Sequence, residues 1–429
     1  MTTILRLPTA SGTRAPQLRT YAGAACLGLF FLGSAVAAFA FADGDQDPAT
    51  TLRAVASSPG TPLAMGWILL ALAALWLGGV LFLAGATRGR GSGWGAAGAV
   101  AGILGAVGAA LIGMHALTTV ALAQTPLEGA VATSQALDGL AGWLVFPLMM
   151  CQPLAVALFA VSLWRQGTVH WWVAPVGCAA VAASILPGAF SSVASLVLGL
   201  ASLGPAAAAV IRRRRAAGWV EEAAPAYRVW GGAACAVALL LLSVAKDVLF
   251  AGADDPDAAL AAVGSHPESL VSEGLMALGV AALFAGTTAF FAGSVRERGS
   301  GLAAAGTVFG VVGSLSIASM GLLDFLTAAL GMSGAGSGVF VPLGGILFPA
   351  FMPLFLAENL MLVAFAAALW RARMTTWVPF ALSLVFGAVA QVHPVGPVAV
   401  AQMVLGLVVA AWLASAVLRS PGQRRSLIV

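Results

Sequence analysis

The stretch FLAGATRGRGSGWGAAG at residues 82–98 returns, with substitutions, as FFAGSVRERGSGLAAAG at residues 290–306. In each copy an apolar run ends in a basic, glycine-rich turn, and a run of small residues follows. Two more pairs repeat: APQLRTYAGAAC (15–26) with APAYRVWGGAAC (224–235), and LWRQG (163–167) with LWRAR (369–373). The offsets are 290 − 82 = 208, 224 − 15 = 209 and 369 − 163 = 206, a drift that loop insertions and deletions produce. The sequence therefore predicts a duplicated chain.

The composition predicts that lipid is the solvent of this protein. Of its 429 residues 60% are hydrophobic and 8% are charged, and the mean hydropathy is +0.99. A soluble chain of this length could not bury so much apolar surface. The net charge of +4 comes from short arginine clusters between apolar runs, so we expect the bilayer, and not a nucleic acid, as the partner.

Apolar runs of about 20 residues predict an all-α, polytopic membrane protein with about twelve spans. The expected spans are 21–42, 64–86, 95–123, 141–164, 171–187, 189–211, 229–251, 269–293, 302–330, 346–370, 376–391 and 395–418. The fifth and the eleventh are short. We expect a first six-helix repeat at 1–211, a basic cytoplasmic linker at 212–227 and a second repeat at 228–429. Because six is even, the repeats are parallel and related by a pseudo-two-fold axis along the membrane normal.

The placement of arginine predicts the orientation. In the twelve-span topology these arginines share one side: Arg6, Arg14, Arg19, Arg88, Arg90, Arg165, Arg212 to Arg215, Arg228, Arg296, Arg298, Arg371, Arg373, Arg419, Arg424 and Arg425. Only Arg53 falls on the other side, where the loops DGDQDP and GADDPD are acidic. Basic loops face the cytoplasm, so we expect both termini there.

Small residues mark positions of close helix packing. Gly98, Gly102 and Gly105 in the third span correspond to Gly306, Gly310 and Gly313 in the ninth. Such spacing lets two helix backbones approach closely, so we assign these glycines a packing role.

Glu358 is the strongest candidate for a substrate or proton site. It precedes Arg371 by 13 residues, which places it roughly 18–20 Å from the cytoplasmic edge of a ~30 Å core. Asn359 follows it, and at an offset of 358 − 152 = 206 it corresponds to Gln152. Each of the two polar residues follows a proline by five positions, and the two-fold would let Gln152 and Glu358 face a common cavity. A neutral, hydrogen-bonded Glu358 that fixes helix packing is the alternative.

Four other charged residues lie nearer the outer edge. Lys246 follows Arg228 by 18 residues, or roughly 27 Å, where its side chain can snorkel to the surface. Asp247, Glu273 and Asp324 lie at a similar level and are expected at the rim. Lys246 is either an interfacial anchor or part of a site with one of these carboxylates.

Metal and cofactor chemistry find no support in the sequence. The four cysteines lie in apolar runs without CxxC spacing, so we expect no disulfide. The four histidines are scattered and no HExxH motif occurs, which predicts neither zinc nor haem. The GxxxxGK[ST] motif does not occur, so the sequence does not indicate an ATPase.

Each half resembles the six-helix integral membrane proteins of unknown function that are common in high-GC bacteria. The likeness rests on an arginine before the first span, an acidic first outer loop, the RGRGSG or RERGSG turn and the LWR that closes the fourth span. It implies the bacterial cytoplasmic membrane and brings no known activity.

The turns GATRGRGSG and GSVRERGSG also resemble the GxxxDRxGR turn of the major facilitator superfamily. They lack its Asp-Arg-x-Gly-Arg pattern, so we interpret that likeness as shared physics and not as kinship.

Architecture favours a secondary transporter, proton-coupled through Glu358, with its site between the two halves. The alternative is a non-transporting scaffold, sensor or partner subunit, whose mark would be a closed interface between the halves. An intramembrane enzyme acting on lipid ranks last, because Glu358 has no nucleophile, base or metal cluster at its depth.

Overall fold

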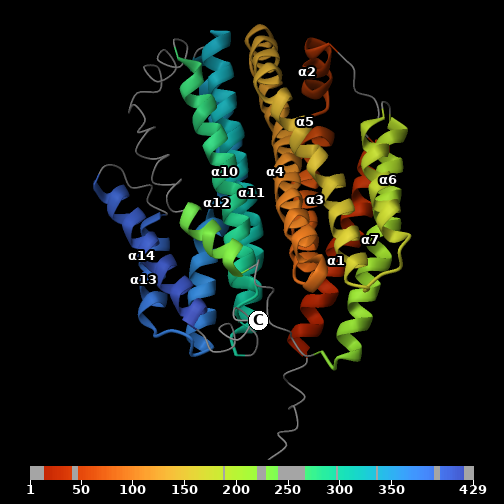
Figure 1. The fold of residues 1–429 in the computed structure, drawn as a ribbon. Coiled ribbons are helices and arrows are strands. Elements are labelled where there is room, and N and C mark those ends of the chain that lie inside the picture. Colours follow the sequence, from red (N-terminus) through yellow and green to blue (C-terminus); the bar gives the residue numbers. More distant parts are fainter. Residues whose placement is uncertain are drawn as a thin grey trace, which may run out of the picture.

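The computed structural model describes residues 14–40, 47–186, 189–219, 229–239, 266–295, 298–334, 337–390 and 397–419. These ranges contain helices and turns and no strand (Figure 1). The elements are α1 (Arg14–Ala40), α2 (Pro48–Ser57), α3 (Gly60–Ala84), η1 (Gly89–Gly91), α4 (Ser92–Leu122), α5 (Leu127–Arg165), α6 (Val173–Ile185), α7 (Ala189–Ala216), α10 (Pro267–Ala292), α11 (Ser300–Ser333), α12 (Ser337–Arg371), α13 (Val378–Ala390) and α14 (Pro397–Arg419). A further apolar helix runs over Val229–Leu239.

The helices are those of a multi-pass membrane protein. In the part of the chain that the structure describes, eight are long and apolar enough to cross a bilayer: α1, α3, α4, α5, α7, α10, α11 and α12. Four more apolar helices are shorter: Val173–Ile185, Val229–Leu239, Val378–Val389 and Val404–Arg419. The all-helical, polytopic class is confirmed, and the count of twelve spans stays a prediction because a helix of 13 residues is only about 20 Å long.

Helices α5 and α12 begin furthest ahead of their predicted spans. Helix α5 begins at Leu127 instead of 141 and has 39 residues, and α12 begins at Ser337 instead of 346. A 39-residue helix is about 58 Å long and must extend beyond a ~30 Å hydrocarbon core. A search for apolar runs finds only the part of a helix that lipid covers, so it misses these extensions.

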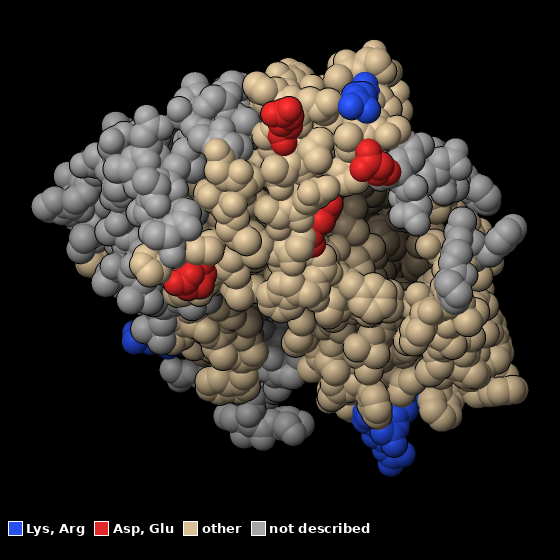
Figure 2. Space-filling model, turned by 90° about the horizontal axis from the view of Figure 1, so that it is seen from above, with Lys and Arg blue, Asp and Glu red and all other residues tan. Residues whose placement is uncertain are grey.

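The ends of the helix bundle differ in charge. We call the end with Arg19, Arg165, Arg214, Arg371 and Arg419 the basic face, and the end with Asp47, Arg53, Glu128 and Glu268 the acidic face. The short helix α2, which the sequence did not predict, lies at the acidic face (Figure 1). Asp47 caps it by accepting a hydrogen bond from the Thr50 amide at 3.3 Å. Figure 2 looks onto this face and shows separate acidic side chains beside a hollow in the surface.

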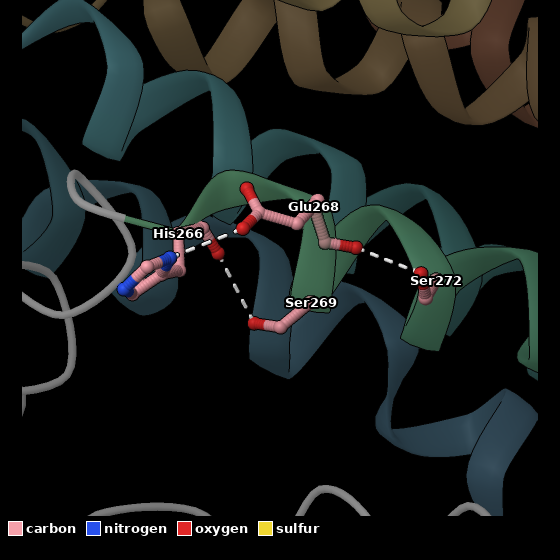
Figure 3. A network of polar contacts seen from close by, with 4 residues as sticks. All are labelled: His266, Glu268, Ser269 and Ser272. Carbon is pink, nitrogen blue, oxygen red and sulfur yellow. Dashed lines mark hydrogen bonds and ion pairs between the residues drawn. The ribbon is translucent and has the colours of Figure 1, made fainter.

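Helix α10 begins at the acidic face in a group of exposed polar contacts (Figure 3). His266 Nδ1 lies 3.1 Å from Glu268 Oε1. The Ser269 hydroxyl donates to the His266 carbonyl at 3.2 Å, and the Ser272 hydroxyl donates to the Glu268 carbonyl at 2.8 Å. The exposure of these contacts marks this end of α10 as a surface region.

The main hydrophobic core runs through both halves of the chain. One cluster of buried side chains includes Val107 and Leu111 of α4, Leu137 of α5, and Leu315 and Leu322 of α11. Helix α11 packs on both α4 and α5, and α12 also contacts α4. The halves therefore share a continuous apolar interior at α4, α5, α11 and α12.

Polar contacts join the halves at both faces. At the basic face the Arg19 guanidinium of α1 donates to the carbonyls of Val295 and Ser300, at 3.1 and 2.8 Å. Toward the acidic face the hydroxyls of Thr133 in α5 and Ser333 in α11 are 3.0 Å apart.

Candidate functional site

Glu358 lies on α12 where this helix approaches α11 closely. A Cβ added to Gly313 of α11 would lie 2.8 Å from the Glu358 Cα and 3.2 Å from its amide nitrogen. These distances are shorter than van der Waals contact, so only glycine permits this spacing. The glycine that the sequence assigned to packing thus holds the backbone that carries Glu358.

The Glu358 side chain is partly buried and lines a cavity of about 240 Å³. The described residues of its wall are Ala236, Leu239, Val280, Phe284, Thr287, Phe291, Ile317, Glu358, Asn359, Met361, Leu362, Phe386, Gln402, Gly406, Leu407 and Ala410. Glu358 is the only ionisable group among these wall residues, and Thr287, Asn359 and Gln402 are the other polar ones. The Thr287 hydroxyl already donates to the Leu283 carbonyl at 2.8 Å. Among the described wall residues, the Glu358 carboxyl group therefore lies beside mainly apolar side chains, with two amides nearby.

Gln152 does not line this cavity. It lies on α5 beside Gly105 of α4, and its Nε2 donates to the Gly105 carbonyl at 3.1 Å. A Cβ at Gly105 would lie 2.9 Å from the Gln152 amide nitrogen, so α4 and α5 approach each other there as α11 and α12 do at Glu358. The structure does not bring Gln152 and Glu358 to one cavity: the wall beside Glu358 is built from the second half, and the Gln152 amide is used within the first.

The remaining candidates differ in their relation to the cavity wall. Asn359 lines the cavity with Glu358, as its neighbour in sequence. Glu273 of α10 and Asp324 of α11 are partly buried near the acidic ends of their helices and do not line it. Lys246 and Asp247 lie outside the described residues.

Sequence reasoning missed Gln402 of α14 as a cavity residue. It lies within an apolar run, but it precedes Arg419 by 17 residues, or about 25 Å of helix, so the depth argument used for Glu358 places it nearer the outer edge. His115 of α4 and Asp138 of α5 were also missed, and their Nε2 and Oδ1 atoms are 3.5 Å apart with side chains 39% and 55% exposed. No sequence signal joins this pair, because His115 and Asp138 lie on different helices and meet only through tertiary packing.

The fold and the cavity define a class: a multi-pass helical membrane protein with the Glu358 carboxyl group in a largely apolar cavity, as its described wall residues show. Within the described ranges, no group of three or more His, Cys, Asp or Glu residues could hold a metal ion. Comparisons with protein-family models, with curated proteins and with solved structures found no match.

Proposed function

We propose that this protein is a secondary transporter that binds a small, mainly apolar cation in the second-half cavity, in exchange with a proton on Glu358. The observation that carries the proposal is the carboxyl group of Glu358 in the cavity wall. The count of residues to Arg371 predicts a position near mid-membrane depth. An ionisable residue at this depth is costly and marks an ion or substrate path more often than a structural position. A cavity of about 240 Å³ suits a small ligand.

The chemistry of exchange follows from the Glu358 carboxyl group. Its ionised form attracts a cation, whereas its protonated form does not. Proton and organic cation therefore compete for Glu358, and the apolar wall favours a cation with a hydrophobic body. Asn359 and Gln402 supply amide groups that can orient polar atoms of the ligand.

We also propose that the two halves are structural repeats, and matched contacts support this. Gly66 approaches the Gly113 carbonyl as Gly274 approaches that of Gly321, with added Cβ atoms at 3.0 and 2.8 Å. Each residue of the second pair follows its counterpart by 208 positions, since 274 − 66 = 321 − 113 = 208. The α4–α12 contact likewise has its counterpart in α5–α11.

Within this repeat, the two halves differ where the cavity lies. Phe284 of the cavity wall corresponds to Trp76, since 284 − 76 = 208. Trp76 is fully buried, donates to the Gly102 carbonyl at 2.8 Å, and packs 4.8 Å from the Phe30 ring. The larger indole fills the first half, and the smaller phenyl ring contributes to the space in the second.

A non-transporting scaffold or partner subunit is the second candidate. The observation in its favour is the continuous apolar core that joins the halves through α4, α5 and α11. This closed interface argues against a substrate path between the halves, and it is the reason we assign the site to the second half alone.

The test uses the full chain in liposomes that contain a pH-sensitive dye. External organic amines and quaternary ammonium ions of increasing size are added, and release of protons from the lumen is recorded. Wild type is compared with Glu358→Gln, with Phe284→Trp, and with Glu268→Gln as a matched control. Glu268 is an exposed carboxylate at the acidic end of α10.

We expect cation-dependent proton flux in wild type and in Glu268→Gln. Glu358→Gln removes the proton-binding group and should abolish the flux. Phe284→Trp fills the cavity as Trp76 fills the first half, and should lower the flux in a folded protein. Flux that survives both cavity variants would assign transport to another site, and no flux in any protein would favour the scaffold.

A further inference from the structure

A second pocket, separate from the Glu358 cavity, opens at the basic face between the end of α12 and the end of α14. Its volume is about 540 Å³. Its wall includes Arg373, Thr375, Thr376, Trp412, Ser415 and Arg419. No acidic residue is among the described residues of this wall, so it combines two guanidinium groups with three hydroxyl groups.

Arg373 occupies a backbone position that favours glycine. Helix α12 ends with the Arg373 amide bonded to the Trp370 carbonyl at 2.9 Å and the Met374 amide bonded to that of Leu369 at 3.0 Å. This is a Schellman ending, which puts its final residue in the left-handed conformation, and Arg373 has φ of 58°. An arginine there carries a steric cost that glycine does not.

The end of α5 shows what the same turn looks like without this cost. The Gly167 amide bonds to the Trp164 carbonyl at 2.8 Å and the Thr168 amide to that of Leu163 at 3.0 Å. Gly167, with φ of 69°, stands where α12 has Arg373, since 373 − 167 = 206. The second half thus has an arginine at a position where the first half has the less strained glycine. A ligand that binds the guanidinium group would explain the presence of arginine there.

Two more residues of the wall point to an anionic ligand near the membrane interface. The Thr375 hydroxyl oxygen is buried and has no hydrogen-bond partner among the described residues. Because Thr375 lies in the pocket wall, an acceptor bound there would supply the missing partner. Trp412 is 39% exposed and precedes Arg419 by seven residues, or about 10 Å of helix. Tryptophan at such a depth is typical of the level of lipid headgroups.

We propose that this pocket binds a phosphate group. Arg373 and Arg419 neutralise its charge, and the hydroxyls of Thr375 and Thr376 donate to its oxygens. The Ser415 hydroxyl donates to the Trp412 carbonyl at 2.8 Å and is not assigned to the ligand. The group belongs either to an anionic phospholipid or to a soluble phosphate compound, because both present the same oxygens. This inference does not depend on the function proposed for Glu358.

The test measures the melting of the full chain in a maltoside detergent, which contains no phosphate. One arm adds phosphatidylglycerol, with the phosphate-free lipid diacylglycerol as its control, and a second arm adds inorganic phosphate or glycerol 3-phosphate. Saturable stabilisation yields an apparent Kd. The variants are Arg373→Gly, which relieves backbone strain and so is not expected to impair folding, and Arg419→Gln. Arg165→Gln is the matched control, because Arg165 is exposed at the same face but does not line the pocket.

We expect saturable stabilisation of wild type, with the apparent Kd raised about ten-fold or more in Arg373→Gly and in Arg419→Gln. Arg165→Gln should stay within about two-fold of wild type. Binding in the lipid arm alone identifies a phospholipid headgroup, and binding in the soluble arm identifies a free phosphate compound. Equal weakening in all three variants would show diffuse attraction to the basic face and overturn the site. So would the lack of saturable binding in both arms.

Discussion

Replacing Gly313 by alanine should separate α11 from α12 at Glu358 and destabilise the protein. The added Cβ would lie 2.8 Å from the Glu358 Cα and 3.0 Å from a ring carbon of Phe284. Carbon atoms pack at about 3.5–4.0 Å, so the helices must part by roughly 0.7 Å or more. Overpacking of this kind costs about 1–3 kcal/mol, and the better helix propensity of alanine returns about 0.5–1 kcal/mol. We expect a net loss of about 1–2 kcal/mol.

The matched control is Gly142→Ala on α5. Gly142 is exposed, and an added Cβ there meets nothing within 4 Å. It gains the same helix propensity without the clash, so its stability should equal or exceed that of wild type. The free energy of unfolding is measured by titrating sodium dodecyl sulfate into detergent micelles. If Gly313→Ala proved as stable as Gly142→Ala, the close approach of α11 and α12 at Glu358 would be wrong.

Two further predictions concern the ends of the helices and the contact between the halves. Arg373 and Gly167 occupy the same left-handed backbone position at the ends of α12 and α5. Replacing each by the other's residue type should change the free energy of unfolding in opposite directions. Arg373→Gly relieves about 1–2 kcal/mol of backbone strain, while the greater conformational freedom of glycine stabilises the unfolded chain by about 0.4–1 kcal/mol. The variant should therefore be more stable by about 1 kcal/mol in phosphate-free detergent. Gly167→Arg should destabilise by a similar amount, and equal melting of both variants would contradict the strain. A double-mutant cycle on Thr133→Val and Ser333→Ala should give a coupling energy of about 0.6 kcal/mol, and a coupling near zero would remove their hydrogen bond from the contact between the halves.

The site was predictable in part. Depth along a helix follows from counting residues at about 1.5 Å each, so the sequence could assign Glu358 to the middle of the membrane. The direction in which it faces could not be counted. That direction depends on how α12 is rotated against α11, α13 and α14, and the packing turns Glu358 and Asn359 toward Gln402 and Phe284. The same dependence explains why Gln152 was wrongly expected to share the cavity.

By itself the sequence determined the class of the protein and the places of closest helix packing. Apolar runs must be helical in lipid because the backbone has no other partner for its hydrogen bonds, and Gly105 and Gly313 could be assigned to packing from their spacing. The tertiary structure alone decided which charged side chains line a cavity or a pocket. The Glu358 cavity and the pocket of Arg373 and Arg419 each join side chains from helices far apart in sequence. Such contacts depend on long-range packing, which no local pattern of residues encodes.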